Sequence, residues 1–141
     1  MSGLESIAVR VEGGANTPHR TDNLRPVLIE LEQAVRRLVD TGVDSVIDLG
    51  AMPFSEQDES DLREVLGSGE VRAELSAFGP SHVEETRFSG VWLVEHLDAE
   101  QRRLTLHLQI TRFPEILAAP LEDVADGLDE LHALNREFPE S

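Results

Sequence analysis

The segment Arg102–Thr111 constrains the fold more than any other part of the chain. Four large apolar residues alternate there with four polar or charged ones: Leu104, Leu106, Leu108 and Ile110 against Arg103, Thr105, His107 and Gln109. A period of two predicts a β-strand with one buried face. Val91–Leu97 precedes it across Asp98-Ala99-Glu100-Gln101, which predicts an antiparallel hairpin with a four-residue turn. That turn would pair Trp92 with His107 and His96 with Arg103.

Three amphipathic helices are predicted around this hairpin. The first spans about Asn23 to Thr41, with Asp22 or Asn23 as its cap and Gly42 as its stop. The second covers about Gln57 to Leu66, where Ser55 caps the helix and Asp58 stands at its third position. The last runs from Pro120 to about Arg136, and its apolar side is expected to face inward: Leu121, Val124, Leu128, Leu131 and Leu134.

Shorter elements complete the predicted order. Strands are expected at Ser45–Leu49, Val71–Ala77 and His82–Phe88, and a short helical turn at Glu115–Ala118. The result is an α+β domain in which helices pack on one face of a mostly antiparallel sheet. A length of 141 residues suits one domain. We assign residues 23–141 to it and residues 1–22 to an N-terminal arm, in which Ile7, Val9 and Val11 suit an edge strand or a frayed tail.

Charge and residue usage exclude several classes of function. Twenty-eight acidic residues oppose twelve arginines, giving a net charge of −16, and the chain has no lysine. This balance argues against nucleic acid and anionic membranes as partners. No apolar run approaches the roughly 20 residues of a membrane span, and the first residues do not resemble a secretory signal. We therefore expect a cytoplasmic protein. With no cysteine, disulfides and thiolate-held metals or clusters are excluded.

No residue pattern points to catalysis or to a bound cofactor. The Gly67-Ser68-Gly69 stretch lacks the spacing and context of a nucleophile elbow. Phosphate-binding glycine motifs are absent. Acidic clusters lie opposite apolar stripes, as on solvated helix faces. We predict no enzyme, no catalytic or metal residue and no cofactor. A small metal-binding protein or enzyme that uses His96, His107 and nearby carboxylates remains an alternative.

One face of the predicted hairpin is a candidate surface for binding a protein partner. Its opposite face, which includes Leu93 and Leu104, is the expected core. Trp92 falls on the side that alternation assigns to solvent, where a tryptophan beside arginine and histidine is a typical binding anchor. The alternative is that the first helix or the N-terminal arm covers it. The residues of this candidate surface are Trp92, Val94, His96, Arg103 and His107.

Three segments together resemble one protein family. They are Val65-Leu66-Gly67-Ser68-Gly69-Glu70-Val71, Glu85-Thr86-Arg87-Phe88-Ser89-Gly90-Val91-Trp92 and Thr111-Arg112-Phe113-Pro114-Glu115-Ile116-Leu117. In order and spacing they are similar to the hydrogenase expression/formation proteins of the HupH (HyaF, HoxQ) type, and the likeness covers about Leu24 to Leu134. Among the motif residues, we expect structural roles at Gly67, Gly69, Gly90 and Pro114, because glycine and proline set turns and helix starts.

The resemblance implies an accessory role in maturation of nickel–iron hydrogenase. Family members resemble chaperones or scaffolds for the iron–sulfur small subunit, so the implied partners are that subunit or its precursor and other hydrogenase accessory proteins. Longer members carry a further N-terminal region, which a homodimer could replace here. Because this chain has no cysteine, such a role would depend on protein contact. A generic acidic interaction module with another partner is the alternative.

Overall fold

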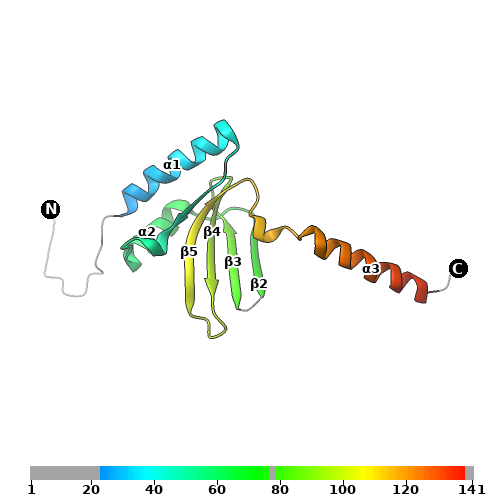
Figure 1. Cartoon of the computed structure of the whole chain (residues 1–141). Coiled ribbons are helices and arrows are strands. Elements are labelled where there is room, and N and C mark those ends of the chain that lie inside the picture. The colour runs from blue at the N-terminus through cyan, green and yellow to red at the C-terminus, as the bar shows by residue number, and fades with distance from the viewer. Residues whose placement is uncertain (1–22, 77–78, 139–141) are drawn as a thin grey trace, which may run out of the picture.

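A computed structural model describes residues 23–76 and 79–138, and the expected N-terminal arm and Ala77 lie outside them. Five antiparallel strands form one sheet in the order β1-β5-β4-β3-β2. Figure 1 shows α1 and α2 on one face of this sheet, whereas α3 runs away from it. The α+β class with an antiparallel sheet is confirmed. The elements are α1 Leu24–Thr41, β1 Ser45–Asp48, the 3-10 turn η1 Leu49–Ala51, α2 Glu56–Leu66, β2 Arg72–Ser76, β3 Pro80–Glu85, β4 Val91–Leu97, β5 Arg103–Ile110, η2 Glu115–Leu117 and α3 Leu121–Glu137.

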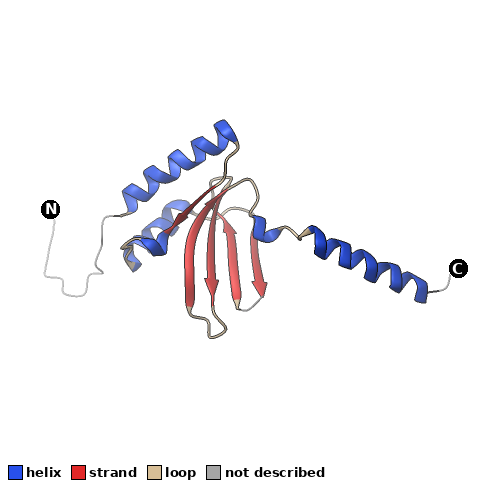
Figure 2. Cartoon of the chain, viewed as in Figure 1, coloured by secondary structure: helices blue, strands red, loops and turns tan. Residues whose placement is uncertain are grey.

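The main core lies between the sheet and the helices α1 and α2 (Figure 2). The expected alternation supplies the sheet's share, because the inward residues of β4 and β5 are buried. The helices contribute the apolar stripes that their 3.6-residue period predicts. Buried members of this core are Val27, Leu31, Ala34, Ile47, Leu49, Leu62, Leu66, Val91, Leu93, Leu106, Leu108 and Ile110.

Local signals explain where α1 and α2 begin and end. The α2 helix begins with a capping box, in which the Ser55 hydroxyl accepts from the Asp58 backbone N–H and the Asp58 carboxylate accepts from that of Ser55. Gly42 ends α1 in the left-handed conformation, with φ of 76°. Asn23 occupies the cap position of α1 without a side-chain cap bond, and instead donates to the carbonyl of Pro53.

The register predicted for the β4–β5 hairpin is wrong by two residues. Trp92 pairs with Gln109 rather than His107, and His96 pairs with Thr105. One residue is added at the turn, where Arg102 joins the loop and its backbone N–H donates to the Asp98 carboxylate. The second is added by a register shift after His96, which leaves Leu104 without a partner across the strand pair.

This irregularity moves two side chains from their predicted places. Leu104 was expected in the core, but as the extra residue it is 63% exposed. Arg103 was expected beside His96, but it pairs with Leu97 and reaches α2 on the helix-covered face. The total shift of two preserves the assigned faces of residues 105–110, because side chains alternate with a period of two.

The α3 helix departs from the prediction most clearly. Its apolar side was expected to face inward, but within the described residues no large apolar side chain of α3 is buried. Figure 1 shows it running out from η2 with no other labelled element beside it. The helices that pack on the sheet are therefore α1 and α2, whereas α3 leaves its apolar side open.

Candidate interaction surfaces

Trp92 lies on the sheet face opposite α1 and α2, where it is 3% exposed. Its indole Nε1 donates to the carbonyl oxygen of Thr111 over 3.0 Å. The ring of Phe113 meets it edge-on, with the two ring centroids 6.5 Å apart. Leu117 from η2 packs against the same cluster. Among the described residues, the cover over Trp92 is therefore residues 111–117 and not α1, one of the two covering elements expected from the sequence; the other, the N-terminal arm, lies outside the described residues.

The other members of the predicted surface do not form one exposed patch. Val94 is completely buried. His96 and His107 are half-buried, and their ring centroids lie 5.6 Å apart because the shifted register makes them diagonal neighbours. The predicted pairs, Trp92 with His107 and His96 with Arg103, would instead separate the two histidines by two pairs along the hairpin. The Ser81 hydroxyl lies 2.7 Å from Nδ1 of His96.

Burial lowers the pKa of His107 below its ordinary value. The nearby His96 ring acts in the same direction, because two positive rings would repel one another. Asp48 opposes the shift, since it lies across from His107 in the β1–β5 pair. The arrangement therefore favours a neutral His107. Within residues 23–76 and 79–138, no group of three or more histidine or acidic side chains could hold a metal ion.

Arg103 connects the sheet to α2 through ion pairs. Its guanidinium donates to both carboxylate oxygens of Glu59 over 2.8 Å, and Nε donates to Glu95 over 2.8 Å. The hydrogen bond from Arg103 is the main cause that holds the pKa of Glu59 below its usual range, against the effect of burial. The same bonds raise the pKa of Arg103. These contacts engage Arg103 within the chain, away from the Trp92 face.

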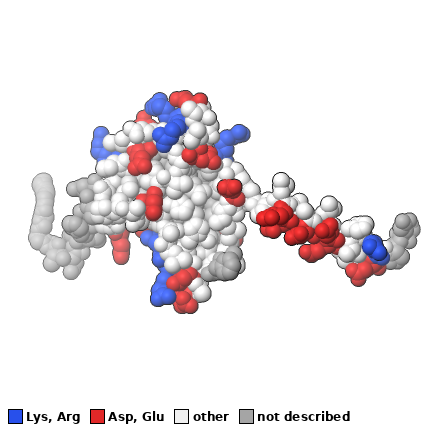
Figure 3. All heavy atoms as spheres, in the orientation of Figure 1, with Lys and Arg blue, Asp and Glu red and all other residues white. Residues whose placement is uncertain are grey.

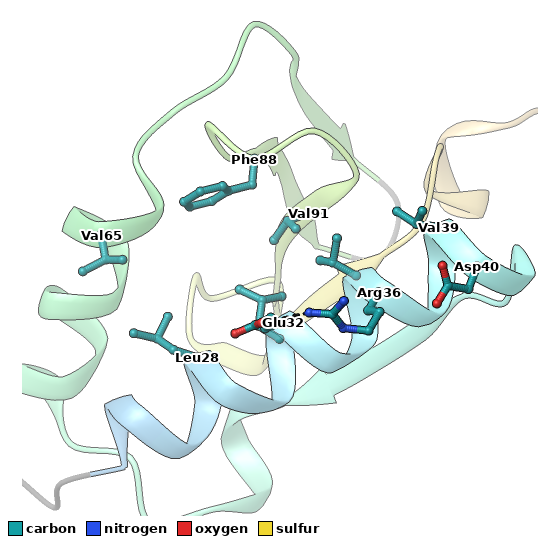
Figure 4. Close-up of a pocket in the computed structure, with 10 residues that line it drawn as sticks. Leu28, Glu32, Arg36, Val39, Asp40, Val65, Phe88 and Val91 are labelled. Atoms are coloured by element: carbon teal, nitrogen blue, oxygen red, sulfur yellow. Dashed lines mark hydrogen bonds and ion pairs between the residues drawn. The ribbon is translucent and has the colours of Figure 1, made fainter.

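An apolar groove of about 460 Å³ opens beside α1, and we call it the α1–α2 groove. Figure 4 shows Val65 of α2 and Phe88 of the β3–β4 connection facing the α1 residues Leu28 and Val39. Exposed Glu32 and Arg36, joined by an ion pair over 3.1 Å, stand at its rim. Its apolar lining consists of Leu28, Leu31, Val35, Val39, Val65, Phe88 and Val91.

The exposed apolar side of α3 is the second large apolar surface, and we call it the α3 stripe. It consists of Leu121, Val124, Leu128, Leu131 and Leu134, whose exposed fractions range from 46% to 85%. Figure 3 shows acidic side chains along one side of this helix and uncharged atoms along its upper edge. Phe113 and Ile116, which are 55% and 43% exposed, extend the apolar surface from the Trp92 cover toward α3.

The sequence pattern revealed the apolar period of α3 but not its exposure. One signal was available, since neither end of this helix carries a good cap. Pro120 gives no side-chain cap bond, and Phe138 ends the helix in an extended conformation. The groove left no signal in the sequence, because its lining comes from three separated segments that only the fold brings together.

The four motif residues lie at the ends of helices and strands or in the segments between them. Gly67 and Gly90 adopt positive φ angles of 62° and 85°. At Gly69 the reason for glycine is a close approach of backbone, since a Cβ there would lie 2.5 Å from the carbonyl oxygen of Thr86. Pro114 precedes η2 and is buried, and its carbonyl accepts from the Leu117 backbone N–H over 3.0 Å.

The fold and its surfaces define an acidic α+β domain with two unfilled apolar surfaces and no metal cluster among its described residues. None of the described helices has the length and apolar character needed to cross a membrane. Residues 22–137 match the family model described as "HupH hydrogenase expression protein, C-terminal conserved region". The chain therefore belongs to the HupH family through this conserved region.

Individual relatives agree with the family assignment. The chain is 30% identical to the hydrogenase expression/formation protein HupQ of Azotobacter chroococcum mcd 1 over 123 residues, which are 86% of this chain and 43% of that protein. It is 29% identical to HoxQ of Azotobacter vinelandii over 114 residues, which are 79% of this chain and 40% of that protein. The chain thus spans less than half the length of these curated relatives.

A solved structure shares the fold. The hydrogenase expression protein HupH from Thiobacillus denitrificans ATCC 25259 matches with a TM-score of 0.82 and 34% sequence identity. The match covers 85% of this chain and all of that one. The predicted resemblance to the HupH family is confirmed.

Proposed function

We propose that this chain is a non-enzymatic accessory protein in the maturation of nickel–iron hydrogenase, acting in the cytoplasm on the iron–sulfur small subunit or its precursor. Membership of the HupH family and the names of the relatives support a place in hydrogenase expression and formation. Direct protein contact is the proposed mode of action. The chain has no cysteine with which to hold an iron–sulfur cluster by thiolates.

The observation that carries this proposal is the exposed apolar side of α3. Monomeric soluble proteins rarely leave a contiguous apolar surface of this kind open, and such surfaces are typical of interaction sites. The α3 stripe can receive an apolar segment of an incompletely folded small subunit. The net charge of −16 would assist approach by a basic client.

In this proposal the Trp92 face contributes mainly through support. Trp92 and Val94 are buried, so they serve as positioning residues and do not touch the client. The bond from Trp92 to the Thr111 carbonyl and its contact with Phe113 hold residues 111–117 in place, and α3 follows that segment. His96 and His107 border this face, whereas Arg103 lies on the other side of the sheet.

The proposal is tested by capture from the native host under conditions that induce hydrogenase. The bait is the tagged full chain, and the captured proteins are identified by mass spectrometry. We expect the hydrogenase small-subunit precursor, and other hydrogenase accessory proteins with it. The Leu128→Gln, Leu131→Gln double variant should lose this capture, because it removes two apolar side chains from the α3 stripe.

The matched control also carries two substitutions to glutamine, but on the acidic side of α3. Asp126→Gln with Glu130→Gln introduces the same helix-compatible side chain and leaves the α3 stripe intact. We expect this control to capture the precursor as the unmodified chain does. Capture of unrelated proteins alone would refute the hydrogenase assignment and favour a generic acidic interaction module.

A further inference from the structure

The α3 helix lacks the features that would stabilise it alone. Most helical stability in proteins comes from packing an apolar face rather than from intrinsic helix propensity. Neither end has a side-chain cap or a left-handed glycine. Gly127 interrupts the interior, where glycine costs about 1 kcal/mol relative to alanine. A helix of this composition needs a packing partner for its stripe.

We infer that the partner in the free protein is a second copy of this chain, and that the α3 stripe of each copy lies in the α1–α2 groove of the other. The two surfaces match in chemistry, since the groove lining and the stripe are both apolar. They also match in length. Leu28 to Val39 spans about 16 Å along α1, and Leu121 to Leu134 spans about 20 Å along α3, at 1.5 Å per residue.

The position of α3 favours a groove on another molecule. Leu117 is packed against the Trp92 cluster, on the sheet face opposite the groove, and only residues 118–120 separate it from α3. Figure 1 shows α3 directed away from α1 and α2. A second copy offers the same groove without withdrawing Leu117 from its own cluster. The reciprocal exchange also has twofold symmetry, which closes the assembly at a dimer.

The reciprocal exchange forms the same contact twice, so that each copy contributes both a stripe and a groove to the interface. Each copy would contribute five large side chains of α3 that are 46–85% exposed, together with the groove that receives them. The acidic residues of α3, among them Asp126, Asp129 and Glu130, are exposed, and the helical period places them off the stripe, where they would stay hydrated. Because each copy carries a charge of −16, added salt should strengthen the dimer by screening their repulsion.

Because the chain has no native cysteine, single cysteines can report the contact directly. The full-length Leu128→Cys and Val39→Cys variants are mixed, oxidised and separated without reducing agent. We expect a disulfide-linked heterodimer of the two variants. The control mixture, Asp126→Cys with Val39→Cys, places the thiol on the acidic side of α3 and should give much less product.

Other products of the same experiment would overturn the inference. Linkage of Leu128→Cys only to itself would indicate pairing of two α3 helices. In a separate variant that carries both cysteines in one chain, an intramolecular disulfide would indicate that α3 folds back onto its own groove. Absence of a cross-link above the control level would indicate that no second copy covers the α3 stripe.

Light scattering of the unmodified protein and its variants provides an independent readout. At micromolar concentration we expect an average mass above that of one chain, which should approach twice the chain mass as sodium chloride is added. Val39→Gln in the groove should raise the dimer dissociation constant, whereas Ile29→Gln, an exposed change on α1 outside the groove, should not. A monomer at tens of micromolar in high salt would overturn the inference.

The dimer and the proposed client would use the same α3 stripe, so the client would have to displace the second copy, and the two proposals need separate tests. Val39→Gln alters the groove and leaves the α3 stripe intact, so it should weaken the dimer without loss of small-subunit capture. An unmodified protein that forms the dimer but captures no small-subunit precursor would oppose the proposed function alone. A monomeric unmodified protein that still captures the precursor would oppose the dimer alone.

Discussion

Replacement of Trp92 tests the packing of the sheet face that α1 and α2 leave uncovered. The side chain is 3% exposed and makes one hydrogen bond, from Nε1 to the carbonyl oxygen of Thr111. Truncation to alanine removes nearly the whole buried ring, and such changes cost about 3–5 kcal/mol of unfolding free energy. Replacement by phenylalanine keeps most of the apolar ring but leaves the Thr111 carbonyl without this donor, at a cost of about 1–3 kcal/mol.

The assay is urea unfolding followed by far-ultraviolet circular dichroism, because Trp92 is the only tryptophan and its fluorescence disappears with the substitution. The matched control is Phe113→Leu, since Phe113 is 55% exposed and keeps an apolar contact after the change. We expect Trp92→Ala to be less stable than Trp92→Phe, and Phe113→Leu to be close to the unmodified chain. A loss below about 0.5 kcal/mol for Trp92→Ala is typical of an exposed side chain and would refute this account of its packing.

Three further changes test other contacts. Arg103→Gln removes the ion pairs to Glu59 and Glu95 and should cost about 1 kcal/mol of unfolding free energy at pH 7, measured in urea. Because the pKa of Glu59 is lowered in the folded state, the stability that this ionised carboxylate adds is lost as the pH falls through the lowered pKa, and the variant should lack this part of the acid sensitivity. The lowered pKa of His107 favours its neutral form, so the free energy of unfolding should fall as the pH drops below about 6.5, and His107→Gln should flatten this decline between pH 8 and 5. An unchanged slope of stability against pH in the variant would oppose a lowered pKa at His107. Gly127→Ala meets no atom within 4 Å and should stabilise the chain by about 0.5–1 kcal/mol in the same urea assay, whereas destabilisation would indicate a close neighbour at that position.

Side-chain period was the most reliable signal in this sequence. The alternation at residues 105–110 and the apolar stripes of α1 and α2 predicted one strand, two helices and their core-facing sides. They did so because an element that is buried on one side carries apolar residues at its own structural period. Ser55 with Asp58, and Gly42, predicted helix ends through specific hydrogen bonds and a specific backbone conformation. These features depend on neighbours in the sequence.

Features that depend on distant residues were not predictable in the same way. An added turn residue and the unpaired Leu104 changed the hairpin register, so Arg103 moved to α2 and His96 came beside His107. An apolar helix face shows that a partner is needed but not which molecule provides it, so α3 was expected to face the core, whereas its apolar side is exposed. The cover over Trp92 comes from residues 111–117, whose path over the sheet no local pattern specifies.

The most direct test of the central claim is binding between the purified chain and the purified hydrogenase small-subunit precursor, measured by sedimentation velocity. We expect a discrete complex with the unmodified chain and with the Asp126→Gln, Glu130→Gln control. The Leu128→Gln, Leu131→Gln variant should sediment separately from the precursor, because its α3 stripe is interrupted. Equal binding by all three proteins would place the contact elsewhere, and absence of a complex with the unmodified chain at tens of micromolar would contradict direct action on the small subunit.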